Sequence, residues 1–349
     1  MLEWISNYGL FLAKGLTVAF LFAMVVMVLS RARREGGPGL ETGHLQVEML
    51  NDRYRAEADA LRSLVWDDAA WKVERKTRKA QAKAERKQTG ADGEGVGKPR
   101  VFVLQFHGDL AATAVTHLRH EISALLAVAE AGRDEVVVLL ESPGGMVHGY
   151  GLAASQLVRI RDAGLRLTVC VDKVAASGGY LMACIADQLL AAPFAIIGSI
   201  GVVAQIPNIH RLLKKNDIDI ELMTAGEYKR TLTMLGENTE AGRRKFQQDL
   251  EDTHVLFKDF VQQWRPQVDL AEVGTGEHWY GRQAIDLQLV DELRTSDDYL
   301  RARAGTASLF ALHWRTRKTV AQRLGLAAEE ASDRLLMRWW QRGLNGPRF

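Results

Sequence analysis

One pattern occurs twice in this chain, as VVVLLESPGGM at residues 136–146 and as LTVCVDKVAASGGY at residues 167–180. Each copy begins with an apolar run that has the length and composition of a buried strand. Each run continues into a loop with a glycine pair, and glycine lets the backbone approach a ligand closely and direct N–H groups at it. Because functional loops in α/β folds follow the carboxyl ends of strands, both loops are candidate site loops.

The sequence around these loops alternates between strand and helix patterns, which predicts an α/β domain. The run from 181 to 206 is apolar, but Asp187, Gln188, Pro193 and several glycines interrupt it, so it is interpreted as a helix, a turn and buried strands and not as a membrane span. The other predicted strands lie at 101–106, 136–140, 167–171 and 218–223, and the predicted helices at 118–128, 147–160 and 242–264.

The N-terminal region predicts a membrane anchor. Residues 8–29 are apolar apart from Lys14, Thr17 and two glycines, and about 20 such residues cross a bilayer as a helix. A cleaved signal peptide is the alternative, but no cluster of positive charges precedes the run. Three arginines follow it, and the positive-inside rule would then leave the rest of the chain in the cytoplasm.

A basic segment separates the anchor from the α/β region. Residues 44–87 lack glycine and proline and are predicted to be helical, while the Gly-rich stretch 90–98 is interpreted as a linker. Its basic part, 72–87, fits a solvated charged helix better than a contact with anionic lipid head groups. The predicted organisation is an anchor at 1–35, a stalk and linker at 36–98, a catalytic domain at 99–305 and a basic tail at 306–349.

Composition excludes some classes of protein. Of the 349 residues, 47% are hydrophobic and 25% are charged, which is typical of a folded chain. A net charge of +2 gives no reason to expect a nucleic-acid partner. Cys170 and Cys184 lie in apolar stretches, which favours buried free thiols. No spaced set of His, Cys and Asp indicates a metal site and no P-loop is present, so neither metal nor cofactor is expected.

Ser177 is the candidate nucleophile, because it lies in the second loop just before a predicted helix. A serine hydroxyl needs a base, and a neutral lysine can serve when burial lowers its pKa. Lys229 follows the predicted strand 218–223 and can reach the same end of a sheet. Arg230 and Lys173 compete for that role, and position alone does not choose among them.

The histidines would suit the commoner Ser-His mechanism. His148 stands three residues beyond Gly145, but it opens a predicted helix and is interpreted as a cleft or capping residue. His107 ends the first predicted strand, where a structural role is favoured over one in lining the cleft.

Four ordered motifs, ESPGG at 141–145, KVAASGGY at 173–180, IGSIGV at 197–202 and GEYKR at 226–230, carry a family resemblance. Together they resemble the signal peptide peptidase A/SohB family of inner-membrane serine-lysine peptidases, and the similarity to the SohB branch extends over nearly the whole chain. The resemblance implies a ClpP/crotonase-like fold of stacked ββα units and assembly into a homo-oligomeric ring. It also implies that Ser177 is the nucleophile and Lys229 the base, 229 − 177 = 52 residues apart.

The same resemblance assigns the remaining site residues. It implies that Ser199 orients the lysine, in place of the alternative interpretation as a buried turn serine. It also implies backbone oxyanion donors from Gly178 and from the first loop, where Gly144 and Gly145 both remain candidates.

The function predicted from sequence is therefore that of a membrane-anchored serine endopeptidase in the bacterial inner membrane. Relatives suggest remnant signal peptides or membrane-associated proteins as substrates and a periplasmic catalytic domain, against the cytoplasmic side given by the charges. A non-enzymatic membrane scaffold is the alternative, and an acyl-CoA enzyme of the crotonase type is a third, which the anchor and the Ser/Lys pair disfavour.

Overall fold

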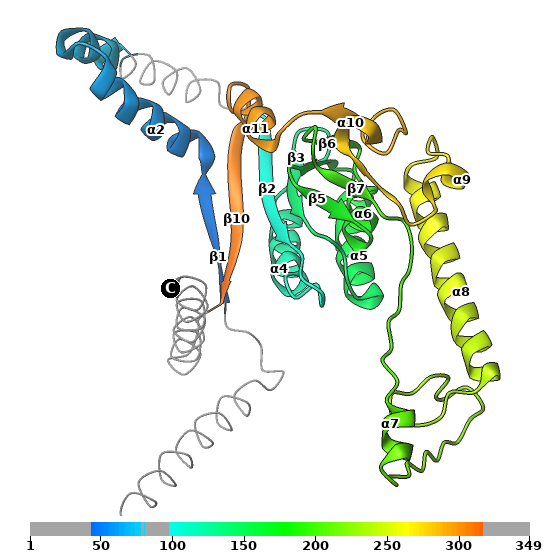
Figure 1. The fold of residues 1–349 in the computed structure, drawn as a ribbon. Helices are drawn as coiled ribbons and strands as arrows, with labels where there is room; N and C mark the ends of the chain where they lie inside the picture. Colours follow the sequence, from blue (N-terminus) through cyan, green and yellow to red (C-terminus); the bar gives the residue numbers. More distant parts are fainter. Residues whose placement is uncertain (1–42, 78–79, 81–97, 317–349) are drawn as a thin grey trace, which may run out of the picture. The chain divides into compact units, whose positions relative to one another are not determined.

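The computed structural model describes residues 43–77, 80 and 98–316 (Figure 1). Residues 45–314 form one compact unit. The predicted anchor at residues 8–29 lies outside the described residues, as do most of the linker and the tail from 317 onward. Among the helices of the described part, none combines the length and the apolar character that a membrane crossing needs.

A seven-stranded sheet forms the centre of this unit, with the strand order β1-β10-β2-β3-β4-β6-β9 (Figure 1). All pairings from β10 to β9 are parallel. The carboxyl ends of these strands therefore meet at one edge of the sheet, where the two glycine-pair loops begin. The strands are β1 (Gly43–Met49), β2 (Arg100–His107), β3 (Glu135–Glu141), β4 (Arg166–Val171), β6 (Gln188–Ala191), β9 (Glu292–Leu293) and β10 (Ser308–Thr316).

The sheet is buried on both faces because alternate side chains of its strands enter two separate cores. In β2, Phe102, Leu104 and Phe106 belong to the larger core, whereas Val101 and Val103 belong to the smaller one. The larger core is shared with α4 (Val115–Leu126), α5 (Val147–Asp162) and α6 (Gly178–Ala183). The smaller core is shared with α2 (Leu50–Val65) and α11 (Ser296–Ala304). The predicted α/β class and the predicted elements between 101 and 171 are confirmed.

A second, three-stranded sheet holds the loop of the candidate nucleophile. It has the order β5-β7-β8, with β5 (Val174–Ala176) parallel to β7 (Ile196–Gly198) and β8 (His278–Tyr280) antiparallel to β7. A parallel bridge between Ser142 and Ala175 joins the loop after β3 to this sheet. The run 181–206 thus contains the end of a helix and buried strands as far as Ile200, as predicted.

The long helix α8 (Glu240–Trp264) confirms the helix predicted over 242–264. The hydroxyl of Thr239 accepts the N–H of Gly242 and so caps its first turn. At its other end Arg265 is 2% exposed and donates to both carboxylate oxygens of Asp291, at 2.7 and 3.1 Å. This buried ion pair attaches the end of α8 to the main core. The chain continues through α9 (Leu270–Val273) and α10 (Gly281–Ala284).

The strand predicted over residues 218–223 is wrong. The segment from 199 to 239 is irregular apart from α7 (His210–Lys215), and in Figure 1 the part around α7 lies away from the two sheets. Ile218, Ile220 and Leu222 alternate as in a strand, but they are exposed and no neighbouring strand pairs with them. Within the described chain, their apolar side chains therefore lack the partner that a strand pattern presumes.

Two further differences concern the ends of the catalytic unit. Residues 43–49 form strand β1 where the sequence predicted a helix from 44, and β10 takes residues 308–316 into the main sheet. The side chain of Asn51 donates to the carbonyls of Ala304 and Ala307 at 3.0 Å and accepts the N–H of Leu309 at 2.7 Å. These bonds link the start of the predicted stalk to β10, so the sheet extends beyond the predicted range 99–305 on both sides.

Candidate functional site

Ser177 occupies a strained turn between β5 and α6. Its φ of 51° and ψ of −121° lie outside the regions that L-residues favour. The turn is held by a hydrogen bond of 2.8 Å from the Ser177 N–H to the carbonyl of Gly198. Strained residues of this kind persist where the surrounding structure fixes them, and a sharp strand-to-helix turn exposes a serine hydroxyl. Ser177 is half-buried, and so remains accessible.

The loop after β3 packs directly against Ser177. Gly144 has a φ of +88°, and a Cβ atom on it would lie 2.7 Å from the Cβ of Ser177 and 2.8 Å from the nitrogen of Gly178. No larger residue fits there without moving one of the loops. The N–H of Gly144 donates to the Oγ of Ser142 at 3.1 Å. In the described chain the N–H of Gly145 has no such acceptor.

Both glycines that follow Ser177 allow close packing of the two loops. A Cβ on Gly178 would lie 2.4 Å from the Cγ of Tyr150, and one on Gly179 would lie 2.4 Å from the carbonyl oxygen of Ser142. Tyr150 was not singled out by the sequence. Its position in the first turn after the glycine loop is the signal that could have indicated it.

Ser199 is brought next to the same centre. Strands β5 and β7 are paired so that Ala176 lies opposite Gly198, and each strand is followed by one of the two serines. Ser199 also has a positive φ, 52°, and its N–H donates to the carbonyl of Glu277 at 2.7 Å. The backbone of Ser199 and the glycine loop thus both lie beside Ser177.

Lys229 is not brought to Ser177 within the described subunit. It lies in the irregular segment before α8, where all residues from 221 to 230 are exposed. Its N–H donates to the carbonyl of Gly226 at 3.2 Å, and among the described residues its amine makes no hydrogen bond or ion pair. Its neighbour Tyr228 lies under the amine of Lys245, 5.8 Å from the ring centre.

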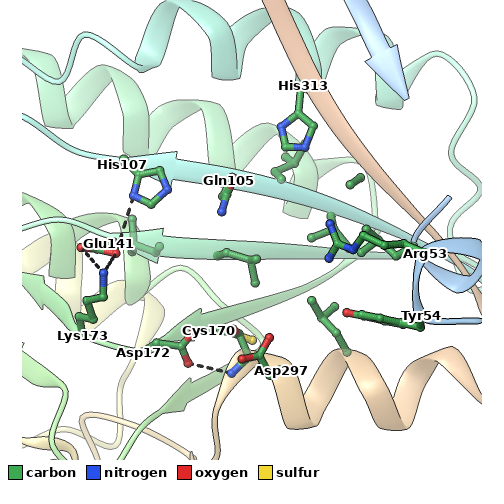
Figure 2. Close-up of a pocket in the computed structure, with 18 residues that line it drawn as sticks. Arg53, Tyr54, Gln105, His107, Glu141, Cys170, Asp172, Lys173, Asp297 and His313 are labelled. Carbon is green, nitrogen blue, oxygen red and sulfur yellow. Dashed lines mark hydrogen bonds and ion pairs between the residues drawn. The ribbon is translucent and has the colours of Figure 1, made fainter. Parts of the chain in front are cut away.

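The rival bases have other partners or positions. The amine of Lys173 pairs with the carboxylate of Glu141 at 3.0 Å, and His107 lies 3.8 Å from the same carboxylate. Both residues line a cavity of about 310 Å³ on the face of the main sheet that carries α2 and α11 (Figure 2). Ser177 precedes α6, which packs in the core of the other face, so neither residue is placed to serve it. His148 is exposed at the start of α5.

Two features of the described residues bear on cofactors and thiols. Cys170 and Cys184 are buried and free, as predicted, and burial raises the pKa of both thiols. No cluster of three or more His, Cys, Asp or Glu side chains within 43–77, 80 and 98–316 has the arrangement of a metal site.

Comparison with known proteins gives the family. Residues 3–157 match the N-terminal region of peptidase family S49, and residues 159–309 match peptidase family S49 itself. A protein of Haemophilus influenzae called "Probable protease SohB" is 48% identical over 341 residues, which are 96% of each chain. A protein of the same name from Buchnera aphidicola is 45% identical over 309 residues, covering 86% of this chain and 100% of the relative. The chain therefore belongs to peptidase family S49 and is a peptidase, as its four motifs predicted.

Proposed function

We propose that this peptidase is a membrane-anchored serine endopeptidase with a ClpP/crotonase-like fold, in which Ser177 attacks the scissile carbonyl. One observation carries the proposal: a serine in a strained turn has the backbone of Gly144 packed against its Cβ, where a larger residue would collide. A carbonyl carbon placed at the Ser177 hydroxyl would therefore lie close to the backbone N–H groups of two loops. That is the arrangement that acyl transfer requires.

The hydrogen bonds already made within the two loops indicate which backbone N–H groups can serve as oxyanion donors. The N–H of Gly144 donates to Ser142 and is not free, which favours Gly145 in that loop. Gly178 supplies the second donor, since it immediately follows the nucleophile and its N–H lies near Gly144. Donors fixed before the reaction stabilise the developing negative charge without reorganising, and this stabilisation commonly contributes more to the rate of acyl transfer than any other effect.

Lys229 is the general base in this proposal, and a homo-oligomer brings it to Ser177. The segment that carries Lys229, residues 199–239, exposes many apolar side chains. Such exposure is typical of a surface that another chain covers. Val203 and Met223 are 91% and 86% exposed. Other exposed apolar side chains of the segment are Ile206, Ile209, Leu212, Ile218, Ile220, Leu222, Tyr228, Met234 and Leu235. Covering them with a second subunit would also remove water from around the lysine, which the base role needs.

Ser199 has a positioning role in the proposal. It follows Gly198, which pairs with Ala176 and accepts the N–H of Ser177, so its backbone lies beside the turn of the nucleophile. A hydrogen bond from the Ser199 hydroxyl would direct the lone pair of the lysine amine at Ser177.

The substrates proposed are peptides or membrane-associated proteins such as remnant signal peptides. A non-enzymatic scaffold would use the same exposed segment for assembly, so activity has to distinguish the two. We expect a serine-reactive phosphonate to label the detergent-solubilised full chain once per active subunit and to leave Ser177→Ala unlabelled. Intact-mass measurement gives the answer. An unlabelled native chain, or labelling that survives in Ser177→Ala, would contradict the assignment of Ser177.

The anchor proposed for residues 8–29 is tested separately. Deleting residues 1–40 removes the apolar run and leaves all the described strands and helices. We expect the shortened protein to be released from the membrane by carbonate or high salt, while the full chain requires detergent. Fractionation followed by immunoblotting measures this. Retention of the shortened protein until detergent is added would mean that another part of the chain inserts into the bilayer.

A further inference from the structure

Tyr150 lies between the two glycine-pair loops of the candidate site and the turn after β2 that contains Asp109. It is wholly buried in the first turn of α5, with its ring against Phe106 at a centroid distance of 6.4 Å. Nothing in the proposed chemistry uses its hydroxyl, yet burial of this polar group requires hydrogen-bond partners. Those partners come from the turn after β2 and from the loop after β3, and its ring supports the loop that carries Ser177.

The ring of Tyr150 supports the residue that follows the nucleophile. A Cβ on Gly178 would lie 2.4 Å from the Cγ of Tyr150, so the backbone of Gly178 rests directly on the aromatic ring. The Tyr150 ring therefore fixes the position of the Gly178 backbone, whose N–H is one of the proposed oxyanion donors.

The hydroxyl of Tyr150 begins a chain of hydrogen bonds whose direction is fixed. The carbonyl of Asp109 can only accept, so Tyr150 donates its single proton there, at 2.8 Å. Ser142 lies 2.6 Å from the Tyr150 hydroxyl and must then donate its own proton to it. The Oγ of Ser142 in turn accepts the N–H of Gly144 at 3.1 Å. Burial raises the pKa of Tyr150, so the phenol stays protonated and the direction holds.

Close packing and backbone bonds leave this chain of bonds little freedom. A Cβ on Gly108 would lie 2.2 Å from the Oγ of Ser142 and 2.3 Å from the Tyr150 oxygen, so glycine is required beside them. The backbone of Ser142 is fixed to the nucleophile's strand, since its N–H donates to Val174 at 2.8 Å and its carbonyl accepts from Ala176 at 3.0 Å.

We propose that Tyr150 is a positioning residue for the oxyanion hole, holding the loop of Gly144 and Gly145 in register with Ser177 and Gly178. It acts through Ser142 on one loop and through its ring on the other, without touching substrate. The inference rests on the proposed serine-peptidase function for its catalytic consequence. The coupling of the loops can be measured without activity.

The variant Tyr150→Phe keeps the ring under Gly178 and removes the hydroxyl. Because displacement of oxyanion donors by a fraction of an ångström weakens transition-state binding, we expect kcat to fall by about 10- to 100-fold with KM changed less than about twofold. Ser142→Ala should lower kcat similarly. The double variant should be about as active as either single one, because both interrupt the same chain of bonds. Additive losses in the double variant would contradict the proposal that Tyr150 and Ser142 act through one chain of hydrogen bonds.

Tyr299→Phe is the matched control. Tyr299 is also buried, 6% exposed, and its hydroxyl bonds to Glu135 and Thr168 in the core on the other face of the sheet. Removing that hydroxyl should lower the melting temperature at least as much as Tyr150→Phe does, by about 2–4 °C, while kcat stays unchanged. An equal fall of kcat in both variants would reduce the role of Tyr150 to general stability and overturn the proposal.

Amide hydrogen exchange separates this inference from the proposed function. Peptides covering residues 142–146 should exchange faster in Tyr150→Phe than in the native chain, and should not change in Tyr299→Phe. Only the first variant removes the hydroxyl that holds the Ser142 side chain, which accepts the Gly144 N–H. Unchanged exchange in Tyr150→Phe would overturn the proposed positioning role of Tyr150, whether or not the protein cleaves peptides. Faster exchange in a chain that proves to have no peptidase activity would uphold the positioning role and contradict the function.

Discussion

Lys229→Arg is expected to abolish peptide cleavage as completely as Lys229→Ala. A lysine amine in water has a pKa of about 10.4 and is protonated at pH 7, so it accepts the serine proton only after removal from water. A guanidinium stays protonated even then and cannot act as a base, although it preserves the positive charge and much of the side-chain length. Loss of general-base catalysis typically costs about 10²–10⁴-fold in kcat, and both variants should show that loss.

The measurement is cleavage of a fluorogenic peptide against pH for the native chain and the two Lys229 variants. His148→Ala is the control, because His148 lies near the glycine loop but is exposed at the start of α5. It should keep most of the native turnover. An inactive His148→Ala enzyme beside an active Lys229→Ala one would replace the lysine with a histidine mechanism. Substantial activity in Lys229→Arg would show that the side chain acts by charge alone.

The sequence predicted those parts of the site whose geometry depends on neighbouring residues. The apolar runs at 136–140 and 167–171 form the predicted strands, and their parallel pairing places both following loops at one edge. Glycine is needed in these loops because they pack closely at that edge, as Gly144 does against Ser177. The fold thus brings Ser177, Ser199 and the glycine loop together, while their catalytic roles remain predictions.

The rest depended on contacts that no local pattern encodes. Most of strand β1 was predicted as helix because residues 44–87 lack glycine and proline, whereas the adjoining Asn51 is bound by residues more than 250 positions away. The role of Tyr150 required two loops to fold onto one hydroxyl. Ile218, Ile220 and Leu222 have the alternation of a strand but no partner within the described chain. In that last case the sequence has the pattern of a half-buried strand, while the side chains are exposed in the described chain.

The exposed apolar side chains of residues 199–239 lead to a second prediction with a large expected effect. Activity should return when two inactive variants assemble together. Ser177→Ala keeps Lys229, and Lys229→Ala keeps Ser177. If Lys229 of one subunit serves Ser177 of the next, a mixed oligomer contains neighbouring pairs in which both residues are intact. Random assembly from equal amounts gives half of the subunits an intact serine and half of those a neighbour with an intact Lys229. About one quarter of the native activity should therefore return in the unselected mixture, and more than one quarter once oligomers of a single variant are removed.

Co-expression with two different affinity tags, followed by purification on both, isolates the mixed oligomers and avoids reliance on slow subunit exchange. Light scattering should first give a mass above that of one subunit, since a fully active monomer would exclude shared sites. The matched control pairs Ser177→Ala with the double variant Ser177→Ala/Lys229→Ala, which supplies no intact serine and must stay inactive. Mixed oligomers of confirmed composition that remain as inactive as both parents would mean that each dyad forms within one subunit. Lys229 would then have to reach Ser177 by movement of residues 199–239, and the exposed apolar side chains of that segment would serve a partner other than this chain.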